Sequence, residues 1–411
     1  MSVLIVEPDF TGHHAPYLRH MLCALAALRQ EAAVLTSRGA LESPQFALHL
    51  RDVSAGVKWD ELLTPFDRSP RYTHRLFNEL LQAVQRHAAK RVWVPYADYL
   101  SLYFGVRAAA LSKARWPSDV RLEGLSFRST FAHPAPRWPK LLSKTLTRLF
   151  VHRANWDVLH FLDPIGYEVI SHRYPHLAHR FRVMPDPVES VPQVDPATAR
   201  QKLGIPDDGR YAGYLGLMAE RDTAERLLSA FRRANLGAKD RLLMAGPMAE
   251  SVRSCVEQEY GDLLRSGRIV TIDRHLNLDE VMLGVMASDL VCIPAKFRMG
   301  SSSFLIRAAT ARRPVLGDDF GWTGWAIKRF NLGWQVDLND VAAFAATLET
   351  AIESAQGHRP TPAAQRFVHF HSADNFKAHW TASLREDLKL EPDPKFVSWQ
   401  SVLNESAGTN L

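Results

Sequence analysis

The amino-acid sequence predicts an α/β protein with two doubly wound lobes that face each other across a cleft. Short apolar runs alternate with helix-length amphipathic segments along the whole chain, which is typical of parallel sheets with helices on both faces. The runs are continuous rather than alternating in apolar residues, as in strands buried on both sides. A proline-rich stretch also divides the 411 residues into two halves of similar length, which fits two or three domains.

The first half begins with Val3-Leu-Ile-Val6, which is ended at once by Glu7-Pro8-Asp9. This run has no basic region before it, so we interpret it as a strand and not as a secretory leader. No apolar run reaches the roughly 18 residues that a membrane-spanning helix needs. Strands are expected at residues 3–6, 33–36, 91–95, 120–127 and 158–161, and helices at 17–29 and 76–89.

The second half repeats the same alternation. Strands are expected at 210–217, 241–245, 269–272, 290–293, 315–317 and 333–336, and helices at 224–234, 248–265, 278–287, 304–311 and 341–354. Residues 184–210 between the halves contain five prolines, which favours an extended connector. We therefore expect Rossmann-like lobes at 1–185 and 210–372, a connector at 186–209, and a C-terminal helix and tail at 373–411.

Composition narrows the function classes only in part. The net charge of +6 and the pI near 9.2 suit a nucleotide, a nucleic acid or an anionic membrane, but also fit a mildly basic protein with no such partner. Nucleic-acid binding is disfavoured because the basic residues are not interleaved with repeated aromatic platforms. The three widely spaced cysteines indicate neither disulfides nor a zinc site, so we expect a cytoplasmic protein.

The loop after the first strand is the first candidate site. It carries Gly12, His13 and His14 just before a helix with Pro16 in its first turn. A glycine here lets a ligand approach the backbone, and a helix start offers free N–H groups to an anion. The pattern G-x-G-x-x-G is absent, so a dinucleotide site is not supported. The alternative is that the two histidines only cap or pack.

The second candidate site is the segment Arg298-Met-Gly300-Ser301-Ser302-Ser303, which precedes the helix at 304–311. Glycine and three serines at a helix N-terminus supply backbone and hydroxyl donors that suit a diphosphate. The alternative is an ordinary N-cap with spare serines. A third loop, from Gly216 to Arg221, also follows a strand and brings a cation, although a lone arginine at a helix start is more often solvated.

The segment 137–153 alternates five basic residues with tryptophan, leucines and phenylalanine. It fits a basic amphipathic helix on an anionic membrane, and equally an ordinary helix that buries its leucine stripe in the first lobe. Nucleophile motifs of the Ser/His/Asp type, a P-loop and a His-Glu-x-x-His element are absent from the sequence.

The second half resembles the retaining, nucleotide-sugar-dependent glycosyltransferases of the two-lobed GT-B fold, in particular glycosyltransferase family 4. The resemblance covers the layout of the whole chain, and residues 182–340 with real specificity. It depends on a turn after an interlobe strand, two strand-to-glycine segments and a helix-to-strand segment. These read Arg182-Val-Met-Pro-Asp-Pro-Val-Glu189, Tyr214-Leu-Gly216, Leu242-Leu-Met-Ala-Gly246 and Ala308-Ala-Thr-Ala-Arg-Arg-Pro-Val315.

The resemblance implies a metal-independent transferase, without a cofactor, that takes a UDP- or GDP-sugar as donor. The acceptor would be a glycan or a lipid-linked molecule in polysaccharide or cell-surface glycan synthesis, with possible peripheral contact to the inner face of the membrane through 137–153. The last helix would return to the first lobe. The donor diphosphate would be bound by Gly12, Gly216, Arg221, Arg298, Gly300, Ser301, Ser302 and Ser303. The base would be held by Arg274 and His275, and the reacting sugar would be served by the catalytic candidates His13, His14 and Arg128.

The chain also departs from the family pattern. Two glutamates usually lie eight positions apart near the donor sugar; here the second position is Arg307 and the first falls at Arg298 or Met299. Two alternatives therefore stay open. One is a catalytically inert GT-B-like binding or partner subunit, and the other is a sugar-nucleotide epimerase of the same architecture.

Overall fold

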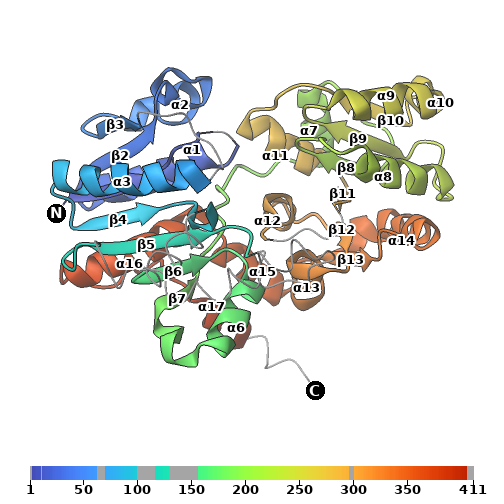
Figure 1. Ribbon diagram of the computed structural model, residues 1–411. Helices are drawn as coiled ribbons and strands as arrows, with labels where there is room; N and C mark the ends of the chain where they lie inside the picture. Colours follow the sequence, from blue (N-terminus) through green and yellow to red (C-terminus); the bar gives the residue numbers. More distant parts are fainter. Residues whose placement is uncertain are drawn as a thin grey trace. The chain divides into compact units, whose positions relative to one another are not determined.

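The computed structural model describes residues 2–10, 12–62, 70–99, 116–129, 156–295 and 300–404 (Figure 1). The chain divides into two compact units. The first comprises Met1–Pro187, Met299–Ser301 and Ala373–Phe396, and the second comprises Val188–Arg298, Ser302–Ser372 and Val397–Leu411. Each unit contains one sheet of parallel strands flanked by helices, so the predicted pair of Rossmann-like lobes is confirmed.

The first unit is built on a seven-stranded sheet of order β3-β2-β1-β4-β5-β6-β7. Its strands are β1 (Ser2–Val6), β2 (Glu31–Ser37), β3 (Lys58–Leu62), β4 (Arg91–Val94), β5 (Arg121–Ser126), β6 (Val158–Phe161) and β7 (Phe181–Val183). Its α-helices in the described ranges are α1 (His14–Ala27), α2 (Pro44–His49), α3 (Pro70–Arg86), α6 (Pro164–Arg173) and α16 (Ala373–Asp387). The order reverses between β1 and β4, and ligands of such sheets bind at the carboxyl ends beside this switch point.

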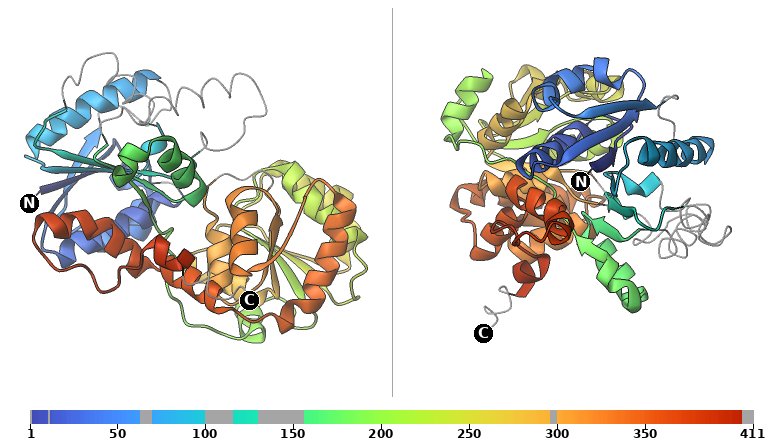
Figure 2. Two further views of the ribbon diagram at one scale, coloured as in Figure 1. Left: turned by 90° about the horizontal axis from the view of Figure 1, so that it is seen from below. Right: turned by 90° about the vertical axis from the view of Figure 1, so that its left-hand side faces the viewer.

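Apolar side chains bury both faces of this sheet. On one face, α1 and α16 pack together over the strands, with Phe376 and Trp380 of α16 in the same core as Leu18 of α1. On the other face, α3 and α6 cover the strands through residues such as Leu80 and Ile170. Figure 2 shows α3 and α16 on opposite faces of the sheet. Helix α16, although it comes from the end of the chain, is therefore part of the first unit's core.

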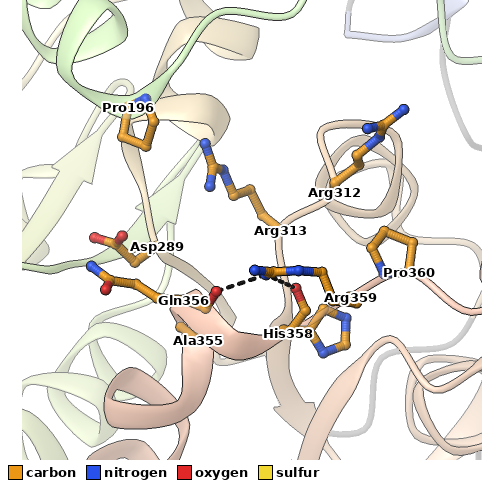
Figure 3. A pocket seen from close by; sticks show the side chains of 9 residues that line it. All are labelled: Pro196, Asp289, Arg312, Arg313, Ala355, Gln356, His358, Arg359 and Pro360. Atoms are coloured by element: carbon orange, nitrogen blue, oxygen red, sulfur yellow. Dashed lines mark hydrogen bonds between the residues drawn. The ribbon is translucent and has the colours of Figure 1, made fainter.

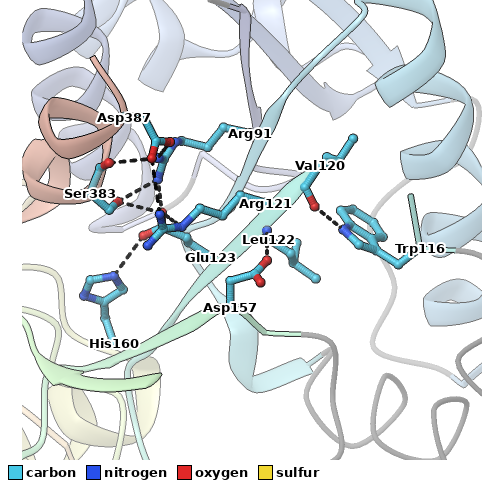
Figure 4. Close-up of polar contacts among 10 residues, drawn as sticks. All are labelled: Arg91, Trp116, Val120, Arg121, Leu122, Glu123, Asp157, His160, Ser383 and Asp387. Carbon is cyan, nitrogen blue, oxygen red and sulfur yellow. Dashed lines mark hydrogen bonds and ion pairs between the residues drawn. The ribbon is translucent and has the colours of Figure 1, made fainter. Parts of the chain in front are cut away.

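A buried polar cluster joins α16 to this sheet (Figure 4). Glu123 of β5 is fully buried and accepts a hydrogen bond from the Ser383 hydroxyl at 2.7 Å. The Arg91 guanidinium forms an ion pair with Glu123 and donates to the Ser383 carbonyl at 3.0 Å. The Nε2 atom of His160 lies 3.3 Å from a carboxylate oxygen of Glu123. Burial lowers the pKa of His160, so its ring is neutral and donates a hydrogen bond to this carboxylate instead of forming an ion pair with it.

The second unit is built on a six-stranded sheet of order β10-β9-β8-β11-β12-β13, with its switch point between β8 and β11. Its strands are β8 (Tyr211–Leu215), β9 (Arg241–Ala245), β10 (Ile269–Ile272), β11 (Leu290–Ile293), β12 (Val315–Asp318) and β13 (Gly333–Val336). Its α-helices in the described ranges are α7 (Pro196–Leu203), α8 (Arg221–Arg233), α9 (Glu250–Glu259), α10 (Gly261–Arg265), α11 (Leu278–Ala287), α12 (Ser303–Thr310), α13 (Gly321–Phe330), α14 (Val341–Ser354), α15 (Pro362–Phe370) and α17 (Trp399–Asn404).

Two expectations about helices were wrong. The proline-rich stretch is not extended throughout, because it contains α7, which packs against α11. Asp195 caps this helix by accepting from the Thr198 N–H, and Pro196 occupies the first turn, where a missing N–H costs nothing. The single helix expected at 248–265 is divided into α9 and α10 at Tyr260, whose backbone leaves the helical region.

Within the described ranges, no helix combines the length and apolar character needed to cross a bilayer.

His20 makes the stability of the first unit dependent on pH. Burial on α1, reinforced by Lys377 and Arg19, lowers its pKa to about 4. Between pH 6.5 and about 4 the unfolded chain therefore binds a proton that the folded chain does not, and the free energy of unfolding falls as the pH falls. We expect His20→Gln to lose part of this dependence when urea unfolding is compared at pH 7 and 4.5.

The matched control for this prediction is His172→Gln, which replaces an exposed histidine on α6. It should retain the pH dependence of the original chain. An unchanged dependence in His20→Gln would contradict the assignment of the effect to His20.

Candidate functional site

The carboxyl ends of several strands in the first unit bring together an aromatic and histidine cluster. The loop after β1 and the first turns of α1 supply the histidines and Tyr17, and the loops after β4, β5 and β7 supply the other three residues. Its members are His13, His14, Tyr17, Tyr96, Phe127 and Asp186. All of these segments meet at one edge because the strands are parallel, which is where a doubly wound sheet binds its ligands.

The predicted residues His13 and His14 lie side by side in this cluster. The His13 ring stacks on Phe127 with a centroid distance of 4.6 Å, while part of its surface stays exposed. Burial among these rings, with the neighbouring His14, lowers the pKa of His13, so its ring is neutral near pH 7. His14 Nδ1 lies 2.9 Å from a carboxylate oxygen of the buried Glu7, and burial raises the pKa of Glu7.

Asp186 organises the other side of the cluster. It accepts a hydrogen bond from the Tyr17 hydroxyl at 2.5 Å and another from the Ser301 hydroxyl. Gly300 approaches the loop after β5 so closely that a Cβ there would lie 2.4 Å from the Phe127 carbonyl oxygen. Gly300 and Ser301 therefore pack within the first unit, whereas Ser302 and Ser303 belong to the second. The four residues expected to form one diphosphate loop are thus divided between the two units.

Arg128 and Gly12 lie at the exposed rim of this edge. The Arg128 backbone N–H donates to Asp98 at 3.4 Å, as do the Phe127 N–H at 2.7 Å and the Ser126 hydroxyl at 2.9 Å. Asp98 thus holds the loop that carries Phe127 and Arg128. Gly12 has φ +60 and open space where a Cβ would be, so its loop leaves room for a ligand.

Two glycine turns define the corresponding edge of the second unit. Gly216 follows β8 with φ +95, and Gly246 follows the adjacent β9 with φ +134. The turns lie against each other, because a Cβ on Gly246 would be 2.2 Å from the Gly216 carbonyl oxygen. A Cβ on Gly216 would lie 2.6 Å from the ring of Phe304, which places the start of α12 beside the same turns. The N–H groups of both glycines are already bonded, to the Ala245 and Ile272 carbonyls at 2.9 Å, so the turns offer a ligand a close approach to the backbone rather than free donors.

Ser302 precedes α12 in an extended conformation and occupies its N-cap position. Its side chain is fully buried but makes no capping hydrogen bond. Among the residues that the structure describes, its hydroxyl has no hydrogen-bond partner. A buried hydroxyl without a partner is costly and uncommon in folded proteins, and here it lies at the positive end of a helix dipole. Together with the first residue of α12, Ser303, it could donate to an anion.

The other predicted donor-site residues have partners already. The Arg221 guanidinium forms ion pairs with the carboxylates of Glu259 on α9, at 2.7 Å, and Glu225 on α8, at 3.5 Å. Its charge is therefore already balanced by these two helices. Arg274 pairs with Glu280 at 2.7 Å and donates to the carbonyl of His275, and both Arg274 and His275 are exposed after β10. Arg298 and the basic segment 137–153 lie outside the described residues. In the described ranges, no group of three or more His, Cys, Asp and Glu side chains is placed to hold a metal ion.

Sequence reasoning did not select Tyr17, Tyr96, Phe127 and Asp186 as site residues. Asp186 stands within the Pro-Asp-Pro turn that was used only for the resemblance, and its two prolines give a signal that could have identified it. The aromatic residues gave no such signal, because Tyr17 lies in a helix and Tyr96 and Phe127 follow two different strands far apart in the sequence. Gly246 was named for the resemblance but was not selected as a site residue, although it directly follows an apolar run as Gly216 does.

No protein-family model and no curated protein matches this chain. Solved structures do match over most of its length. Sucrose-phosphate synthase from Thermosynechococcus elongatus superposes with a TM-score of 0.70 at 14% identity, covering 95% of this chain and 99% of that one. HepE of Anabaena, solved with UDP, superposes with a TM-score of 0.62 at 15% identity, covering 95% of this chain and 100% of that one. A glycosyltransferase from Rickettsia africae superposes with a TM-score of 0.66 at 13% identity, covering 95% of this chain and 99% of that one. The fold of this chain is therefore the two-lobed GT-B fold.

Proposed function

We propose that this protein is a glycosyltransferase that moves a sugar from a nucleotide-sugar donor to an acceptor, with the donor bound by the second unit. The observation that carries this proposal is the pair of facing glycine turns, Gly216 and Gly246, beside the start of α12. Similar structures of HepE contain UDP and UDP-glucose, which supports a uridine nucleotide in particular.

The chemistry follows from what these elements offer. A departing nucleoside diphosphate carries negative charge that fixed donors can stabilise. The hydroxyls of Ser302 and Ser303 and the positive end of α12, beside the turn at Gly216, would supply such donors without a metal ion. Arg298 would add charge, and Arg221 would do so only by releasing Glu259. The exposed loop of Arg274 and His275 would hold the base.

The first unit would bind the acceptor at its aromatic and histidine cluster. A neutral His13 can exchange hydrogen bonds with a sugar hydroxyl, and the ring of Phe127 beside it provides an apolar surface.

The proposal includes the finer features of the family 4 resemblance: transfer with retention, and a glycan or lipid-linked acceptor in polysaccharide synthesis. Peripheral membrane contact through 137–153 belongs to the same proposal, and charge reversal of Lys140, Lys144 and Arg148 should then abolish binding to anionic liposomes.

Ser302→Ala tests the donor site, because its effects on stability and on binding should have opposite signs. Removing a buried hydroxyl that has no partner should leave the free energy of unfolding unchanged or raise it by up to about 1 kcal/mol. Losing a hydrogen bond to a diphosphate should weaken UDP binding by about tenfold or more. Thermal unfolding with a panel of UDP, GDP, ADP, CMP and dTDP, followed by calorimetry with the nucleotide that responds, measures both effects.

Ser251→Ala, at an exposed position of α9, is the matched control and should bind the nucleotide as the original chain does. Equal nucleotide binding by Ser302→Ala and the original chain would remove Ser302 from the site. Nucleotide binding without transfer or hydrolysis of any nucleotide sugar would favour an inert binding subunit, and a response to no nucleotide would refute the proposal.

A further inference from the structure

A cavity of about 360 Å³ lies within the second unit, away from the two glycine turns (Figure 3). A volume of this size is within the range of small-molecule sites. The cavity is formed where the turn after α12 meets the segment between α14 and α15. It is lined by Pro196, Asp289, Arg312, Arg313, Ala355, Gln356, His358, Arg359 and Pro360.

The cavity lies at the opposite edge of the sheet from the proposed donor site. Asp289 immediately precedes β11, and Arg313 lies two residues before β12, so both stand at the amino ends of their strands. Gly216 and Gly246 stand at carboxyl ends. Because all strands of this sheet are parallel, the two sets of residues mark opposite edges. A ligand in the cavity would therefore be separate from the nucleotide.

The lining of the cavity is strongly cationic. Three arginines contribute to it, and the single carboxylate is already engaged: Asp289 pairs with Arg200 at 2.7 Å and accepts from the Tyr211 N–H at 2.8 Å. Arg359 donates to the backbone carbonyls of Gln356 and His358 at 2.8 and 3.0 Å, which holds the turn but does not neutralise the guanidinium. The positive charge of the cavity therefore has little compensation.

Arg313 is the most unusual of these residues. It is half-buried, and in the described part of the chain its Nε has no hydrogen-bond partner. Burial lowers its pKa, Arg200 acts in the same direction, and Asp289 and Asp195 act against it. Asp195 is itself occupied by the N–H and hydroxyl of Thr198. An anion would stabilise a guanidinium that is partly desolvated and has an N–H without a hydrogen-bond partner.

We propose that this cavity binds a small phosphate-bearing anion through Arg313, with Arg312 and Arg359 on its rim. The planar guanidinium offers two parallel donors that match a phosphate, and it keeps its charge at any physiological pH. The volume leaves room for an organic group attached to the phosphate, and His358, whose pKa is lowered by burial and by Arg359, can bond that group as a neutral ring.

Calorimetric titration of the full chain at constant ionic strength tests this inference. The probes are inorganic phosphate and glycerol 3-phosphate, applied to the original chain and to Arg313→Gln, Arg359→Gln and the control Arg233→Gln. Arg233 is an exposed arginine on α8 that does not line the cavity. We expect saturable binding, a loss of about tenfold or more in Arg313→Gln, a smaller loss in Arg359→Gln, and no change in Arg233→Gln.

Tighter binding of glycerol 3-phosphate would identify an organic phosphate as the ligand, and equal binding would identify the phosphate group alone; both outcomes support the site. Absence of saturable binding, or an equal loss in Arg233→Gln, would overturn it. Circular dichroism checks that Arg313→Gln is folded. If this variant does not fold, the loss of binding is measured on Arg359→Gln, which replaces an exposed residue. UDP binding should be unchanged in Arg313→Gln, so a failure here is distinguishable from a failure of the proposed function.

Discussion

Replacing Glu123 with glutamine is expected to lower the free energy of unfolding by about 3 kcal/mol at pH 7. The carboxylate is completely buried, and Arg91, His160 and Ser383 hold the pKa of Glu123 at about 2 against the opposing effect of burial. Removing one partner of a buried ion pair leaves the other charge poorly compensated, which typically costs 3–5 kcal/mol. The carboxylate of Asp387 also pairs with Arg91, so we expect the lower end of this range.

Urea unfolding of the full chain measures this loss, and Glu42→Gln is the matched control. Glu42 is exposed, so its substitution should change the free energy of unfolding by less than about 0.5 kcal/mol. Because the folded pKa of Glu123 is depressed, its contribution is complete above the unfolded pKa near 4.5 and is lost as the pH falls toward 2. A change below about 1 kcal/mol in Glu123→Gln would show that the cluster does not join α16 to the sheet as described.

Gly246→Ala is expected to reduce stability by more than about 2 kcal/mol and to abolish UDP binding. The new Cβ would lie 2.2 Å from the Gly216 carbonyl oxygen, and φ +134 is a conformation that side-chain-bearing residues rarely adopt. The obstacle is backbone rather than a flexible side chain, so the turn after β8 must move. That movement would displace the groups proposed to bind the diphosphate.

Gly267→Ala separates this clash from the conformational cost alone. Gly267 also has a positive φ, of +72, but no atom lies within 4 Å of where its Cβ would be. Gly267→Ala should lower the free energy of unfolding by about 1–2 kcal/mol and leave UDP binding intact. Thermal unfolding with and without UDP measures both variants. Normal UDP binding by Gly246→Ala would contradict the placement of the donor at the facing turns.

The strands were the most predictable part of the fold. Continuous apolar runs such as Leu290–Ile293 are buried on both faces, and burial of this kind leaves a clear compositional signal. Strand β3 (Lys58–Leu62) was missed because it lies at the end of the sheet and carries three charged residues, as edge strands often do. Helix α7 was missed because proline was interpreted as a breaker, although Pro196 occupies the one turn where it is favourable.

The candidate site was predictable where its residues lie in a single loop between a strand and the next helix. Gly216 directly follows β8, Gly12 lies in the loop between β1 and α1, and both adopt positive φ. Asp186 and Phe127 join His13 only through the parallel sheet, which brings loops from distant parts of the chain to one edge. No spacing in the sequence encodes that meeting.

The sequence by itself therefore determined that this is a two-lobed, doubly wound α/β protein with glycine turns at the carboxyl ends of its strands. Hydrophobic periodicity and backbone conformation are local properties that a single segment displays. Only the tertiary structure decided that Ser301 contacts Asp186 while Ser302 is left without a described partner, and that Glu123 of β5 meets α16. Those contacts depend on which segments the packed sheets place side by side, and therefore on the whole chain at once.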